Sequence, residues 1–186
     1  MNSRSSRSWT GIVAICVGVA VLAAASASVM VIAFGGSMAG PWRGPVGSQC
    51  DVPELPGSVV DVALADAGTM MGSGPIMVSV RAEPQVIATG TISFLVRNRG
   101  QLVHELTVMP VTASGPGSRR TDSDGTVSED GALGHAESAC ASGEGDGIPP
   151  GSASWLTLKL TPGQYELICN EPWHYRNGMY DVLTVT

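Results

Sequence analysis

The sequence predicts an all-β fold, a Greek-key antiparallel β-sandwich preceded by one N-terminal transmembrane helix. From Val59 onwards, short segments alternate apolar with polar or small residues, the pattern of antiparallel strands with one buried and one solvated face. No comparable helical stripe occurs in this part. Before it, residues 12–34 form an uncharged apolar stretch. The length of 186 residues therefore fits one domain with additional segments rather than two full domains.

The N-terminal segment predicts a membrane anchor. As a helix, residues 12–34 would extend about 34 Å, enough for a hydrocarbon core of ~30 Å. Arg4 and Arg7 precede it, which favours a cytoplasmic head at residues 1–11 and an extracytoplasmic C-terminal part. A cleavable signal peptide is the alternative, because Ala25-Ser26-Ala27 resembles a cleavage site. The apolar run continues to Phe34, and we therefore expect a single-pass protein of the cytoplasmic membrane.

Residues 35–56 are rich in Gly and Pro and lack periodicity, which predicts a tether, with an ordered arm as the alternative. The remaining residues, 57–186, form the predicted β domain. Its clearest strand faces are Val60/Val62/Leu64, Ile76/Val78/Val80, Ile92/Phe94/Val96 and Leu156/Leu158/Leu160. With the strands expected around His104, Cys169 and Tyr180, about seven strands result, as in small sandwiches.

Residues 112–150 predict a long loop within this domain, because they are rich in Gly, Ser and Asp and show no strand alternation. Loops of this length are usually functional covers or disordered. Asp122-Ser123-Asp124-Gly125 is similar to the start of a calcium loop, but the later ligands of that motif are missing. His135 also lies here, without a pattern of ligands around it. A solvated loop is the expectation.

The four cysteines lie in different predicted parts of the chain, and only two are available for a disulfide. Cys16 lies in the anchor and Cys169 in a motif described below, which leaves Cys50 and Cys140 outside the membrane. Exported domains permit disulfides, and we expect these two to be bonded, with two free thiols as the alternative. Closing a loop of this size is worth about 4–5 kcal/mol in the chain-entropy model.

Charge restricts the possible partners. The residues beyond the anchor include 16 acidic and 8 basic side chains, a net charge of −8. Such a surface repels nucleic acid. A partner rich in Lys or Arg is favoured instead.

The segment 169–179 carries the chemistry. Four residues separate Cys169 from His174, and four more separate His174 from Met179. A copper ion that cycles between Cu(I) and Cu(II) takes a Cys thiolate and two imidazoles in a plane, with a weak axial Met. Pro162-Gly163 predicts a turn that starts a strand over 164–169, and Cys169 then ends this strand on its core side.

His104 is the candidate for the second imidazole. In the expected strand 101–108, it shares the apolar face of Leu102, Leu106 and Val108. A lone histidine there would more often be a core residue than a ligand. The motif at 169–179 makes a ligand the better interpretation.

Three groups of residues together resemble the cupredoxins, the small blue copper electron carriers. They are Asn98-Arg99-Gly100 followed by His104-Glu105, then Pro162-Gly163-x-Tyr165, then Cys169-x4-His174-x4-Met179. The equal spacings are most similar to the sulfocyanin and rusticyanin branch, and the resemblance covers roughly residues 57–186. Trp173 and the long insertion before Pro150 are not part of this resemblance.

The resemblance implies one mononuclear type 1 copper held by His104, Cys169, His174 and Met179, and an electron carrier rather than an enzyme. Redox proteins, such as membrane respiratory components, would be its partners. We expect outer hydrogen bonds around the copper from Asn98, Glu105 and Asn170.

Several other functions are less consistent with the sequence. A multicopper oxidase or nitrite reductase needs more than the three histidines present. A dinuclear copper site needs a second Cys where Glu171-Pro172-Trp173 stands. Copper delivery or storage without electron transfer is the main alternative, and a sandwich used only for adhesion is the remaining one. Met70, Met71 and Met77 would either hand over Cu(I) or serve as packing or loop residues.

Overall fold

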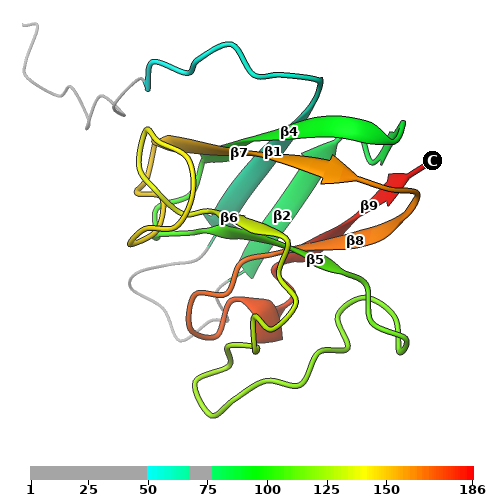
Figure 1. Cartoon of the computed structure of the whole chain (residues 1–186). Coiled ribbons are helices and arrows are strands. Elements are labelled where there is room, and N and C mark those ends of the chain that lie inside the picture. Colours follow the sequence, from blue (N-terminus) through cyan, green and yellow to red (C-terminus); the bar gives the residue numbers. More distant parts are fainter. Residues whose placement is uncertain (1–49, 68–76) are drawn as a thin grey trace, which may run out of the picture. The chain divides into compact units, whose positions relative to one another are not determined.

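The computed structural model describes residues 50–67 and 77–186, which form two β-sheets packed face to face (Figure 1). The elements of the described part are β1 (Ser58–Ala67), β2 (Met77–Glu83), β3 (Val86–Ile87), β4 (Gly90–Asn98), β5 (Leu106–Pro110), β6 (Gly134–Ala136), β7 (Ala153–Leu160), β8 (Gly163–Ile168), the short 3-10 helix η1 (Tyr175–Asn177) and β9 (Tyr180–Val185).

Both sheets are mixed, which corrects the predicted antiparallel sandwich of about seven strands. One sheet has the order β2-β1-β4-β7 and the other β3-β9-β8-β5-β6. β1 runs parallel to β4, with Val60 opposite Phe94, and β3 runs parallel to β9. Alternation in the sequence shows which face of a strand is buried but not which strand is its neighbour. The two strands that were not expected, β3 and β6, are too short to show a period.

The main core lies between the two sheets and confirms the faces predicted for β1 and β4. The predicted face of β2 is confirmed at Val80, while Ile76 lies outside the described residues. Val60, Val62 and Leu64 of β1 are buried in it. Ile92, Phe94 and Val96 of β4 are fully buried as well. In contrast, Met77 begins β2 with 68% of its surface exposed, so this thioether does not contribute to the core.

A second, smaller core lies on the other face of β5 and β8. It contains Met109 of β5, Ile168 of β8, Tyr175 of η1 and Val127 of the segment 112–133. Figure 1 shows this segment running beside the red loop that follows β8. The expectation of a solvated loop over 112–150 was therefore incomplete, because part of this stretch packs on the sheet and part forms β6.

A buried ion pair holds the segment 112–133 in place. Glu166 of β8 is fully buried, and one of its carboxylate oxygens accepts from Arg119 Nε at 2.8 Å. The other oxygen accepts from Gly117 N at 2.7 Å and from the Tyr175 hydroxyl at 3.0 Å. One carboxylate thus joins the segment to the loop that follows β8.

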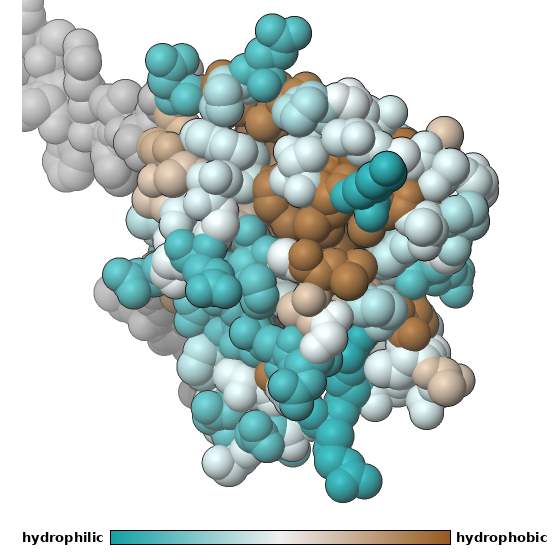
Figure 2. Space-filling view, viewed as in Figure 1, coloured by the Kyte–Doolittle hydropathy of each residue, from teal (hydrophilic) through white to brown (hydrophobic). Residues whose placement is uncertain are grey.

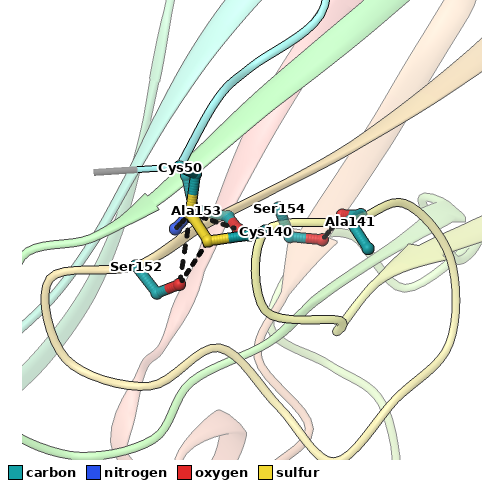
Figure 3. Close-up of a disulfide and its surroundings, with 6 residues drawn as sticks. All are labelled: Cys50, Cys140, Ala141, Ser152, Ala153 and Ser154. Atoms are coloured by element: carbon teal, nitrogen blue, oxygen red, sulfur yellow. Dashed lines mark hydrogen bonds between the residues drawn. A yellow bond between two sulfur atoms is a disulfide. The ribbon is translucent and has the colours of Figure 1, made fainter. Parts of the chain in front are cut away.

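The disulfide between Cys50 and Cys140 is present, which confirms the predicted pairing (Figure 3). It lies beside the start of β7, where Ala153 N donates to Cys50 Sγ at 3.3 Å. Ser152 Oγ lies 3.4 Å from the same sulfur. The bond therefore ties the start of the β domain to the stretch between β6 and β7.

The predicted anchor at 12–34, the head at 1–11, most of the tether, and Met70 and Met71 lie outside the described residues. In the part of the chain that the structure describes, no helix has the length and apolar character needed to cross a membrane.

Candidate metal centre

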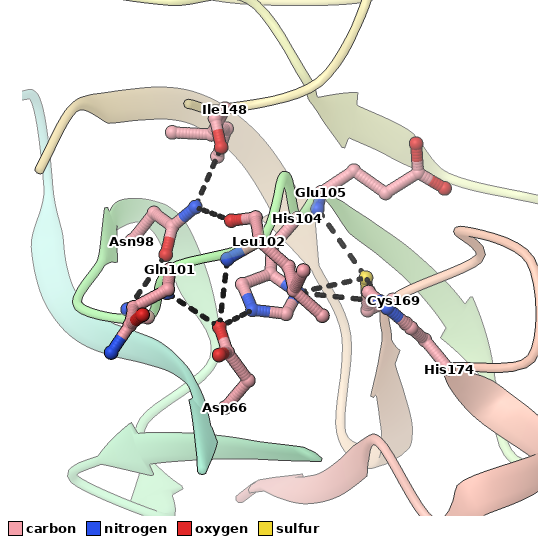
Figure 4. Close-up of polar contacts among 10 residues, drawn as sticks. Asp66, Asn98, Gln101, Leu102, His104, Glu105, Ile148, Cys169 and His174 are labelled. Carbon is pink, nitrogen blue, oxygen red and sulfur yellow. Dashed lines mark hydrogen bonds and ion pairs between the residues drawn. The ribbon is translucent and has the colours of Figure 1, made fainter. Parts of the chain in front are cut away.

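His104, Cys169 and His174 converge at one end of the sandwich (Figure 4). Cys169 Sγ lies 3.3 Å from His174 Nδ1 and 3.8 Å from His104 Nδ1. The two Nδ1 atoms are 3.3 Å apart. Three ligand atoms from two distant parts of the sequence thus form a compact triangle.

The triangle has the size that a metal ion requires. A point equidistant from the three atoms would lie about 2 Å from each, close to the ~2.0–2.3 Å of metal bonds to imidazole nitrogen and thiolate sulfur. A thiolate with two imidazoles is the equatorial ligand set of mononuclear copper sites that transfer electrons. The residues present therefore fit a copper ion.

Cys169 and His104 reach the site from the two strands that pair at its base. Cys169 directly follows β8, and with Tyr165 and Leu167 it lies in the main core, as the strand period predicted. His104 lies two residues before β5 and pairs with Ile148 through an isolated bridge. The strand expected over 101–108 is therefore shorter, but His104, Leu106 and Val108 still share the buried face.

The loop 169–179 closes on itself through backbone hydrogen bonds. Met179 N donates to His174 O and Cys169 N donates to Met179 O, each at 3.1 Å. Gly178 has a φ of 90°, which a glycine adopts without strain. Met179 is fully buried in the same core cluster as Cys169, and its role as the axial ligand stays a prediction.

Asp66 orients His104 and was not found from the sequence. Its Oδ1 accepts from His104 Nε2 at 2.9 Å, and also from the backbone amides of Gln101 at 2.7 Å and Leu102 at 3.0 Å (Figure 4). A proton on Nε2 leaves the Nδ1 lone pair directed at the triangle, and such carboxylate–histidine pairs are common around metals. Asp66 lies in β1, 38 residues before His104, and no motif relates the two positions.

Asn98, Glu105 and Asn170 make the kind of outer hydrogen bonds that we expected. Asn98 Nδ2 donates to Leu102 O and Ile148 O, each at 2.7 Å. Glu105 N donates to Cys169 Sγ at 3.4 Å, and the Glu105 carboxylate accepts from Asn170 N at 3.0 Å. These bonds hold the segments that carry His104 and Cys169 against each other.

Burial controls the protonation of the three ligands. It lowers the pKa of His174 to about 4, with a further contribution from the nearby His104, and it lowers the pKa of His104 despite the opposing effect of Asp66. Both imidazoles are therefore neutral at pH 7, and each can offer a nitrogen lone pair to a metal ion. Burial raises the pKa of the Cys169 thiol to about 12, although the amides of Glu105 and Glu171 oppose this shift. A bound metal cation would displace the thiol proton.

The site is closed on the protein side and partly open at His174. His104 and Cys169 are fully buried, whereas His174 is half-buried and its neighbour Trp173 is 48% exposed. Trp173 N donates to Asp124 O at 2.9 Å. The segment 112–133 therefore contacts the ligand loop next to its most exposed ligand.

No family model matches the chain, and no curated protein matches it. Among solved structures, reduced rusticyanin is 15% identical, with 75% of this chain and 90% of that chain covered and a TM-score of 0.42. Rusticyanin from Thiobacillus ferrooxidans is 17% identical, with 70% and 79% covered and a TM-score of 0.41. Auracyanin from the photosynthetic bacterium Roseiflexus castenholzii is 17% identical, with 71% and 98% covered and a TM-score of 0.42.

Rusticyanin and auracyanin are cupredoxins, so these solved structures come from the family that the sequence motif resembles. At these identities and TM-scores the likeness decides nothing about what this chain binds or does. What the site of this chain binds follows from its own residues and distances.

Proposed function

We propose that this protein is a membrane-anchored type 1 copper protein that carries single electrons between redox partners outside the cytoplasmic membrane. The observation that supports this most is the triangle of Cys169 Sγ with the Nδ1 atoms of His104 and His174, with the buried Met179 nearby. Copper bound there would supply reversible one-electron chemistry, because soft sulfur ligands favour Cu(I) while the imidazoles and thiolate also accommodate Cu(II).

The protein contributes a ligand set that is already in place. Asp66 fixes the ring of His104, and the backbone hydrogen bonds of the loop fix Cys169 and Met179. Little rearrangement is then needed when the charge of the site changes. Burial of Cys169 and His104 excludes water from these two ligands.

The half-buried His174 is the proposed point of electron entry and exit. Val103 directly precedes His104 and Trp173 directly precedes His174, and both are among the exposed large apolar residues. Figure 2 shows that apolar side chains gather in the middle of the viewed face, with hydrophilic surface below. An apolar contact of small area suits a short-lived redox encounter.

The membrane location and the partners are part of the proposal. The apolar stretch 12–34, with arginines before it, supports an anchor with the domain outside the cytoplasm. Membrane respiratory components are the proposed partners. The net charge of −8 beyond the anchor favours basic docking surfaces on them and disfavours nucleic acid.

Copper delivery or storage would use the same four ligands and is the alternative function. Two measurements on the full-length chain separate the two. Cu(II) should give an intense thiolate-to-copper absorption in the visible range, and one-electron reduction and reoxidation should remove and restore it without release of copper. A Cys169→Ser variant should lose the absorption and keep the fold.

An absorption spectrum that is unchanged in Cys169→Ser would refute the copper assignment. Absorption that depends on Cys169, but with copper released at each reduction cycle, would instead favour delivery or storage.

A further inference from the structure

A second group of metal-ligating side chains lies outside the copper site. Glu129, His135 and Glu137 each offer one ligand atom, and these atoms all lie within 4.8 Å of one another. His135 Nδ1 and Glu137 Oε1 are 2.7 Å apart. The sequence pattern around His135 did not predict a site, and the structure brings Glu129 and Glu137 close to this histidine.

The register of β5 and β6 creates this group. Leu106 pairs with Ala136 and both are fully buried in the main core. The neighbouring pair, Thr107 and His135, therefore points to the opposite face. Glu137 lies two residues after His135 and shares that face. A His-x-Glu pair at the end of a strand is thus the signal that the sequence contained.

Glu129 completes the group from the segment 112–133. Its Oε1 accepts from Asn170 Nδ2 at 3.0 Å and from Thr107 Oγ1 at 3.3 Å. Thr107 Oγ1 also lies 3.4 Å from His135 Nδ1. These contacts position the exposed Glu129 near His135. The segment between the two residues forms no regular strand or helix, so the sequence pattern did not indicate this proximity.

The burial of Glu137 favours a nearby cation. This residue is only 9% exposed, and among the described residues His135 is its one side-chain hydrogen-bond partner. A buried carboxylate is costly unless it is paired, and the His135 imidazole that pairs with Glu137 also lies near the carboxylate of Glu129.

We propose that Glu129, His135 and Glu137 bind a divalent transition-metal cation, with Zn²⁺ as the representative, at a site separate from Cys169. One imidazole and two carboxylates are hard to borderline ligands that Zn²⁺ accepts at ~2.0–2.2 Å. The imidazole disfavours Mg²⁺ and Ca²⁺, which prefer oxygen ligands. The exposed side at Glu129 leaves an entry path and a position for water.

Zn²⁺ titration of the full-length, copper-free chain tests this site by calorimetry. Zn²⁺ can also enter the triangle at Cys169, but that contribution is the same in every variant compared below. The wild type should bind one more equivalent than Glu129→Gln and His135→Ala, or should bind that equivalent at least 10-fold more tightly. Glu144→Gln is the matched control, because it removes an exposed glutamate from the same 112–150 stretch and should behave as the wild type.

Equal Zn²⁺ stoichiometry and affinity in the wild type and Glu129→Gln would overturn the proposal. Glu129 is exposed, so this variant remains informative even where His135→Ala fails to fold. The same difference between wild type and Glu129→Gln should persist in a Cys169→Ser background. The outcome is therefore independent of whether the triangle binds copper.

Discussion

The two ligand groups lie on opposite faces of the same short stretch of sheet and differ in how they are held. His104 and Cys169 are fully buried, and the three ligand atoms of their triangle are 3.3–3.8 Å apart. The ligand atoms of the Glu129 group lie within 4.8 Å, and Glu129 itself is exposed. A closed, preformed triangle suits a metal that stays bound during turnover. An open group suits a cation that exchanges with solvent.

The largest effect should come from removing one imidazole from each group in turn. His174→Ala should abolish the visible copper absorption and leave the extra Zn²⁺ equivalent intact, because it deletes a ligand of the triangle alone. His135→Ala should do the reverse. Visible spectroscopy and Zn²⁺ calorimetry on both variants check this, and a single variant that removes both signals would show that the two groups form one site.

The segment 112–133 serves both groups, since it carries Glu129 and contacts the backbone of Trp173. Arg119→Met should therefore destabilise the domain by about 3 kcal/mol, because it leaves the buried Glu166 without its cation. Urea unfolding measures the loss. Arg120→Met, an exposed neighbour, is the control and should have little effect.

The double variant Arg119→Met, Glu166→Gln sharpens this test. Neutralising the carboxyl group should recover part of the stability lost in Arg119→Met. If Arg119→Met alone unfolds at the wild-type urea concentration, the ion pair does not hold the segment, and its contact with Trp173 must be maintained in another way.

Substitution of Asp66 should have the next largest effect, a loss of copper affinity. Loss of an outer carboxylate from a ligating histidine typically costs about 10–100-fold in metal affinity. We expect Asp66→Ala to fall in this range and Asp66→Asn to be milder, since an amide oxygen can still accept from Leu102 N and Gln101 N. Competition with a copper chelator measures both. Asp61→Ala, a surface change on the same strand, is the control and should keep the wild-type copper affinity. Equal copper affinity in all three variants would show that Asp66 does not support copper binding.

Residues that share a local sequence pattern could be predicted, whereas residues that meet only through tertiary contacts could not. Three of the proposed copper ligands lie on one loop after one strand, so their spacing alone predicted Cys169, His174 and Met179 as ligands. His104 was found because the strand period placed a histidine among buried residues. Asp66 and Glu129 were not found, because each reaches its histidine through tertiary contacts between segments without a shared period. The parallel pairing of β1 with β4 was missed for the same reason, since no local pattern encodes a strand's neighbour.

The smallest effect should appear at Asn170, the residue that connects the two groups. Its side chain accepts from Val127 N at 2.7 Å and donates to Glu129 Oε1 at 3.0 Å, whereas its backbone amide donates to Glu105. Asn170→Ala removes only the side-chain bonds. A hydrogen bond is worth about 1 kcal/mol, so we expect about a fivefold loss of Zn²⁺ affinity.

The copper absorption of Asn170→Ala should stay close to that of the wild type, because the backbone bond beside Cys169 remains. Asn177→Ala is the matched control, since its side chain donates to Trp173 O in the same loop and does not contact Glu129. It should leave Zn²⁺ affinity unchanged. The opposite pattern, with wild-type Zn²⁺ affinity and a shifted copper absorption in Asn170→Ala, would mean that the Asn170 side chain acts on the triangle and that Glu129 is positioned without it.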